Sequence, residues 1–402
     1  MHTVWIIFLA AIGACVGSFL NVVIHRLPRG QSIVFPPSHC PQCGRRIKWY
    51  DNIPLVSWLA LRARCRFCGV RISPRYILVE GATALLVAGL YVCYYVLDIR
   101  EGAGRFEDTW PMFLSHAALL CGLLACTMVD IERWIVPLEV CWFVTLVALA
   151  ANAAAPHAWL PAISPTSGAI GLAAAVGLIL ANVAAHFGLI QRSFIDAEDK
   201  PLPAPPPKED KARRGKKSKA DKKAKPAPPA VATTSEHGVN PRKEVLREVL
   251  FLAPAFILAG GAWALVTYVP AAGNAWRSAV AHGPLAPHIN GLLAGLLGYL
   301  VGGLWVWGAR ILGTLAFGKE AMGLGDVHIL AAVGAAGGWL VPSVAFFVAP
   351  LFGLVWALYL LVARNQRELP YGPWLALATL VVLLFYDAFA TLLEPYLAAL
   401  GC

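Results

Sequence analysis

Two aspartates at the ends of apolar segments are the residues of this sequence best suited to chemistry. Asp326 follows two glycines in the stretch Gly323–Asp326, and Asp130 ends another apolar run almost two hundred residues upstream. An isolated carboxylate in lipid is costly, so an acid at membrane depth indicates a functional site. Two carboxylates held close cannot both ionise easily, so one stays protonated while the other accepts a proton from water. The pair predicts hydrolysis, in which that water attacks an amide carbonyl.

The surroundings of each acid leave simpler interpretations open. Gly323 and Gly325 would let the backbone approach closely or depart from helical geometry, which makes room for an extended peptide. Taken singly, either aspartate could instead cap the end of a helix. Asp387, within the last apolar segment, could be a third acid, but a buried hydrogen-bond partner is the simpler interpretation.

Four of the ten cysteines form two Cys-x-x-Cys pairs, Cys40-Pro-Gln-Cys43 and Cys65-Arg-Phe-Cys68. They lie in a strongly basic segment that charge places in the cytosol, where reducing conditions disfavour disulfides. The spacing is typical of zinc ribbons and predicts a structural tetrathiolate Zn²⁺ site. The cysteines within apolar runs are interpreted as small buried hydrophobic residues.

The elements that must position these residues are membrane helices. Apolar residues make up 58% of the 402 and charged residues only 14%, against roughly 25% charge in a typical soluble domain. We predict an all-α polytopic fold of about ten transmembrane helices with a small cytoplasmic zinc-ribbon-like loop domain. The predicted spans cover residues 4–24, 77–97, 112–129, 138–155, 166–190, 249–269, 288–311, 327–341, 345–363 and 372–393.

Charge predicts which side of the membrane each loop faces. Residues 25–75 hold ten Lys and Arg with Asp51 as their only acid, and residues 191–248 hold fifteen against nine acids. Cytoplasmic loops carry the excess of Lys and Arg. With the amino terminus outside, the parity of spans places both basic segments and both aspartates on the cytoplasmic side. A basic loop can also bind nucleic acid, but we expect no such partner for a membrane protein.

Together these features resemble the bacterial type IV prepilin peptidases, a family of leader peptidases and N-methyltransferases that act as intramembrane aspartic peptidases of the Gly-x-Gly-Asp type. The resemblance rests on several strings in family order, which frame residues 15–157 and 289–395. They are residues 17–28 (GSFLNVVIHRLP), both Cys-x-x-Cys pairs, residues 50–59 (YDNIPLVSWL), 72–76 (ISPRY), 318–326 (GKEAMGLGD) and 369–373 (LPYGP).

The resemblance implies that Asp130 and Asp326 are catalytic and that Gly323 and Gly325 shape the loop beside them. It implies a multi-pass protein of the bacterial inner membrane whose site faces the cytoplasm. The substrate would be a prepilin or pseudopilin of a type IV pilus or type II secretion system, cut after the glycine that ends a short basic leader. The new amino terminus would then be methylated from S-adenosylmethionine, whose binding residues the sequence does not identify. Membrane lipid is the other expected partner.

The chain also departs from the family pattern. Glu132 and Leu138 stand where aspartates are usual, His328 where lysine is common, and Ala63 where a glycine precedes the second cysteine pair. The change at Ala63 bears on methyl transfer more than on cleavage.

Compared with the family pattern, the chain carries an insertion. We therefore predict five domains. They are the first transmembrane helix (1–24), the four-Cys loop (25–76), helices carrying the first acid (77–157), an insertion with two extra helices and a disordered basic linker at about 191–248 (158–288), and a peptidase core with the Gly-Leu-Gly-Asp motif (289–402). The linker is too polar to bury a core of its own.

The alternative from another class is a transporter or assembly scaffold with a zinc-stapled cytoplasmic loop. Such a protein would carry ionisable residues near the middle of several spans, whereas this chain is nearly bare there except for Asp387. A presenilin-like or preflagellin-like peptidase shares the aspartate chemistry, but the zinc-ribbon loop favours the bacterial prepilin type.

Overall fold

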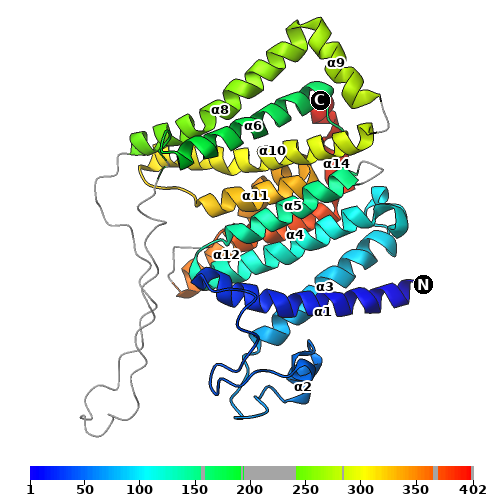
Figure 1. Ribbon diagram of the computed structural model, residues 1–402, viewed down its shortest axis with the longest axis vertical. Coiled ribbons are helices and arrows are strands. Elements are labelled where there is room, and N and C mark those ends of the chain that lie inside the picture. The colour runs from blue at the N-terminus through cyan, green and yellow to red at the C-terminus, as the bar shows by residue number, and fades with distance from the viewer. Residues whose placement is uncertain (155–158, 192, 194–240, 283–284, 365–369, 400–402) are drawn as a thin grey trace.

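The computed structural model describes the chain except for residues 155–158, 192, 194–240, 283–284, 365–369 and 400–402, and the described part is helical throughout its regular structure (Figure 1). The predicted all-α class is therefore confirmed. The helices are α1 (His2–Arg26), α2 (Val56–Ala60), α3 (Arg75–Tyr95), α4 (Phe106–Arg133), α5 (Leu138–Ala154), α6 (Pro165–His186), α8 (Pro241–Tyr268), α9 (Pro270–Ala281), α10 (Ala286–Phe317), α11 (Leu324–Gly337), α12 (Leu340–Arg364), α13 (Gly372–Leu384) and α14 (Tyr386–Ala399).

Seven helices in the described ranges are long and apolar enough to cross a bilayer, namely α1, α3, α4, α6, α8, α10 and α12. The consecutive helices α13 and α14 give an eighth span if they are counted together. The apolar helices α5 and α11 are shorter. Each of the ten predicted spans thus falls on helical structure. By length and composition, seven or eight of them qualify as membrane spans.

Three features differ from the sequence prediction. The last predicted span, 372–393, is not one straight helix, because α13 stops at Phe385 and α14 departs from it by 82°. Helix α8 begins at Pro241, whereas we predicted linker up to residue 248 and a span from Val249. Helix α9 was not predicted, and it packs on α8, α6 and α10. The rest of the predicted disordered linker, residues 194–240, lies outside the described residues.

The helices lie side by side, with α1 and α3 along one edge of the bundle and α6, α8 and α9 along the other (Figure 1). Helices α4 and α11 lie between these edges. Helix α4 is the most buried of the seven spans, and α11 packs against α4, α5, α10, α12 and α13. Small residues dominate α11, whose sequence is LGDVHILAAVGAAG, and such residues let membrane helices pack closely. The two acids are therefore carried by the most enclosed helices of the bundle.

Candidate functional site

Asp130 lies in the last turn of α4, where it is buried. The helix ends just beyond it because Trp134 adopts a left-handed conformation, φ 61°, and donates its N–H to the Asp130 carbonyl at 2.8 Å. The carboxylate Oδ2 of Asp130 accepts a hydrogen bond of 3.1 Å from the backbone N–H of Gly372, the first residue of α13. The side chain is therefore held in place by a backbone donor from a distant part of the chain.

Asp326 lies in the first turn of α11 and is only partly buried. The carboxylate of Asp130 is close enough to act electrostatically on it. The carboxyl end of α4 and the amino end of α11 lie at the same end of the bundle (Figure 1). The structure thus brings together two acids that are far apart in the sequence.

Gly325 accounts for how closely α11 approaches the turn after α4. A Cβ atom at this position would lie 2.5 Å from Cβ of Val136. Non-bonded carbon atoms do not come so near to one another. Gly323, by contrast, is the extended residue that precedes α11, with φ −71°. Of these two glycines, Gly325 is the one that lets α11 approach the turn after α4 closely.

A Gly325→Ala substitution is expected to destabilise the protein by about 1–3 kcal/mol, because α11 must move away from Val136 to accommodate the methyl group. The measurement is thermal unfolding of the full chain in detergent. The matched control is Gly308→Ala in α10, where a Cβ meets nothing within 4 Å. This control should be neutral or stabilising by up to about 1 kcal/mol, since alanine favours a helix over glycine. Equal melting temperatures of the two variants would contradict a close approach of α11 to Val136.

Tyr371 and Gly372, at the start of α13, complete the site. Their role could not be assigned from the sequence. The Asp326 carboxylate acts electrostatically on the hydroxyl of Tyr371, and this hydroxyl donates to the Phe346 carbonyl at 3.4 Å. A Cβ atom at Gly372 would lie 2.7 Å from Oδ2 of Asp130. Only glycine leaves room there for the carboxylate to reach the backbone N–H.

Two acids brought to the same end of a helical bundle can serve general acid–base chemistry. One carboxylate is buried and fixed by a backbone N–H, and the other is partly accessible. Neighbouring carboxyl groups can share one proton and bind a water between them. Such a pair can activate water at one atom and donate a proton at another.

The four predicted zinc ligands also come together. The Sγ atoms of all four cysteines lie within 4.8 Å of one another, and Sγ of Cys40 lies 3.8 Å from Sγ of Cys68. Four thiolates about 2.3 Å from a tetrahedral zinc would be separated by about 3.8 Å. The geometry and the donor set fit a Zn²⁺ ion, held by Cys40, Cys43, Cys65 and Cys68.

The two cysteine pairs fold alike, as two similar turns. Cys40 accepts an N–H bond from Gly44 and donates to Arg45, with N···O distances of 2.9 and 3.0 Å, and Cys65 does the same with Gly69 and Val70, both at 2.9 Å. Backbone N–H groups of Cys68 and Phe67 lower the pKa of the Cys65 thiol to about 7. Because the thiolate is the metal ligand, the second turn prepares the Cys65 sulfur for a cation.

Polar contacts attach this loop to the membrane helices. The Arg66 guanidinium binds both carboxylate oxygens of Asp51, at 2.6 to 3.1 Å, within the loop. The N–H of Leu55 donates to Oε2 of the buried Glu80 in α3, at 2.7 Å. Asn21 in α1 donates to the Tyr76 carbonyl at 3.2 Å. The Leu55 bond fixes the loop to α3, and the Asn21 bond joins α1 to the first turn of α3.

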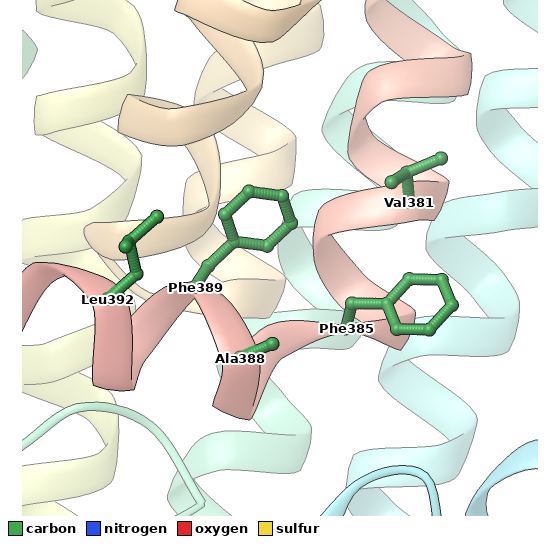
Figure 2. Close-up of a pocket in the computed structure, with 5 residues that line it drawn as sticks. All are labelled: Val381, Phe385, Ala388, Phe389 and Leu392. Carbon is green, nitrogen blue, oxygen red and sulfur yellow. The ribbon is translucent and has the colours of Figure 1, made fainter.

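Asp387 lies away from the two acids, at the bend between α13 and α14. Its Oδ2 accepts the backbone N–H of Glu101 at 2.9 Å, so it is a hydrogen-bond partner, but it is only partly buried and not buried as we expected. An apolar pocket of about 240 Å³ lies at the same bend (Figure 2), and it offers no group suited to chemistry. Its lining residues are Val381, Phe385, Ala388, Phe389 and Leu392.

Known proteins match this chain along most of its length. The family model described as "Bacterial Peptidase A24 N-terminal domain" matches residues 11–94. A protein of Myxococcus xanthus is 52% identical over 134 residues, which cover 33% of this chain and 36% of that protein. A protein of Pseudomonas aeruginosa is 26% identical over 402 residues, covering 94% of this chain and 89% of its own length. A third, from Dickeya chrysanthemi, is 39% identical over 175 residues, covering 33% and 61%.

All three relatives are named prepilin leader peptidase/N-methyltransferase. No solved structure matches the chain. The fold and the site define a class of helical membrane proteins with paired acids at one end of the bundle and a four-cysteine loop. Within that class, the chain is similar to the prepilin leader peptidases/N-methyltransferases, and its amino-terminal part matches the bacterial peptidase A24 model.

Proposed function

We propose that this protein cleaves the leader peptide from type IV prepilins or pseudopilins, with Asp130 and Asp326 as its catalytic pair. The observation that carries the proposal is the meeting of these two acids at one end of the bundle, from helices far apart in the sequence. The names of the relatives support the substrate class.

In the proposed mechanism one carboxylate accepts a proton from water while the other, protonated, polarises the scissile carbonyl. The hydrogen bond from the backbone N–H of Gly372 would hold the Asp130 carboxylate in place during the reaction. The oxygen of the water bonds to the carbonyl carbon, and the departing amine takes a proton from the pair as the C–N bond breaks. Neither aspartate forms a bond to the substrate, so the pair returns to its shared-proton state.

The pair would act on the cytoplasmic side of the bacterial inner membrane. The end of the bundle that carries the acids also bears the basic four-cysteine loop (Figure 1), and basic loops stay in the cytoplasm. The apolar helix of a prepilin would lie in the bilayer beside the bundle. Its scissile bond would then sit at the height of the two acids.

The relatives' names include N-methyltransferase, and we extend the proposal to methylation of the new amino terminus. S-adenosylmethionine would supply the methyl group. The described residues offer no site that we can assign to this cofactor, so no step of the transfer is derived. A structural Zn²⁺ held by the four cysteines would staple the loop without taking part in cleavage.

The proposal is tested by co-expressing the full chain with an epitope-tagged prepilin and determining the pilin's amino terminus by mass spectrometry. We expect the leader to be removed after its last glycine and the new terminus to carry one methyl group. Cells without the protein should keep the leader intact. An uncut prepilin beside membranes that contain the protein would overturn the proposal and favour the transporter or scaffold alternative.

A further inference from the structure

A buried arginine connects α8 to the loop that leads to Asp326. Arg310 in α10 is fully buried, and its Nε donates to Oε1 of Glu248 in α8 at 2.7 Å. Its Nη1 donates to Oε1 of Glu320 at 2.6 Å and to the carbonyl of Met322 at 2.5 Å. Glu320 and Met322 lie between α10 and α11. One guanidinium therefore contacts both the inserted helix and the loop before Asp326.

Glu248 is the more buried of the two carboxylates that bind the guanidinium of Arg310. Glu248 is 3% exposed, whereas the side chain of Glu320 is 35% exposed. A carboxylate near water contributes less to a buried charge than one screened from water. Oε1 of Glu248 also accepts a hydrogen bond of 2.9 Å from the Ser193 hydroxyl. Both hydrogen bonds reach the same oxygen of Glu248, and this oxygen holds the guanidinium of Arg310.

The geometry of arginine transmits this position to the loop. The guanidinium is planar, and its N–H donors point in fixed directions. The plane fixes the angle between the Nε and Nη1 donors, so the bond of Nε to Glu248 restricts where Nη1 can bind Glu320 and the Met322 carbonyl. Met322 is followed by Gly323, the residue that precedes α11. The start of α8 lies beside the same loop, since a Cβ at Gly318 would lie 4.0 Å from Cγ of Pro241.

We propose that Glu248 is a positioning residue for Asp326, acting through Arg310 and the loop of residues 318–323. The inserted helix α8 then helps to set the distance between the two acids. The inference rests on the proposed function, because it assigns Glu248 a role in that reaction. It explains why a helix at the edge of the bundle carries a buried acid toward α10.

The test uses Glu248→Gln and Glu320→Gln in the full chain, assayed on a tagged prepilin and normalised to the amount of protein in the membrane. Each is expected to lower the cleavage rate by about tenfold to a hundredfold, since small displacements of catalytic groups have effects of this size. Each should also shift the pH optimum, because the coupling of two carboxyl groups depends on their separation. The control on the same helix is Arg247→Gln, whose side chain is 40% exposed and which should cleave normally.

The pH profile separates positioning from a merely structural role. Partial unfolding reduces the amount of active protein but leaves the pH optimum of the remainder unchanged. If Glu248→Gln does not accumulate in the membrane, Glu320→Gln tests whether Arg310 positions the loop. The more exposed side chain of Glu320 is less needed for folding. Wild-type rates and pH optima in the variants that accumulate, or lower rates with an unchanged optimum, would overturn the positioning role.

The same assay includes Asp326→Asn to distinguish the two ideas. If this variant still cleaves the prepilin, the proposed function is wrong. If it is inactive while both glutamine variants behave as wild type, only the role of Glu248 is overturned.

Discussion

Replacement of Asp130 or Asp326 by asparagine is expected to lower the rate of prepilin cleavage by about 10²- to 10⁴-fold, the usual effect of losing a general acid or base. Asparagine has nearly the same shape as aspartate, and its carbonyl oxygen can still accept the N–H of Gly372. The amide cannot take a proton from water or share one with the other acid. Initial rates with purified full-length protein and a tagged prepilin measure the effect.

The matched control is Asp387→Asn, an acid in the same bundle that binds a backbone N–H at the bend of α13 and α14. This variant is expected to cleave at the wild-type rate. The double variant of Asp130 and Asp326 should be little slower than either single one, because groups that act as a unit are not additive. Cleavage at the wild-type rate by either single asparagine variant would contradict the catalytic pair.

The meeting of the two acids could be anticipated from the sequence because two independent signals agree. Apolar runs end at Asp130 and begin after Asp326, and charge asymmetry places both ends on one side of the membrane. Neither signal reveals Gly372 as the donor to Asp130, because a backbone N–H leaves no trace in residue type. Its position depends on how α13 packs against α4, which is a tertiary property.

The bend at Phe385 could not be predicted for a related reason. The residues on both sides of it are apolar, so hydropathy reads straight through from α13 into α14. The carboxylate of Asp387 instead binds the loop before α4. A contact with another part of the chain thus holds the start of α14, and such a contact leaves no signal in local hydropathy.

The start of α8 shows the opposite error. Its first turns, PRKEVLRE, are so rich in charge that we interpreted them as linker. In the structure Glu244 and Glu248 are buried, and Glu248 is paired with Arg310 of α10. Local composition suggests solvent exposure, but the partner that neutralises the charge lies more than sixty residues away.

Zinc removal is the second large effect we expect, because the loop of residues 25–75 has little else to hold it together. Its described regular structure consists of short helical turns and two isolated bridges, with few buried side chains. Structural zinc contributes about 10–16 kcal/mol in small zinc-binding units, far more than the single Asp51–Arg66 pair, whose arginine is half exposed, can replace. A strong chelator, or Cys40→Ser combined with Cys65→Ser, should therefore unfold the loop.

Limited digestion with trypsin reports this unfolding, since the loop holds ten Lys and Arg, and elemental analysis should find one zinc per chain in the untreated protein. The matched control is Cys15→Ser in α1, an exposed cysteine outside the cluster, which should keep both zinc and protease resistance. A metal-free protein that resists trypsin as well as the untreated one would show that the cysteines do not staple the loop. Because Asn21 joins α1 directly to Tyr76 of α3 without the loop, unfolding of the loop should leave the helical content of the bundle nearly unchanged. Circular dichroism separates this local loss from global unfolding.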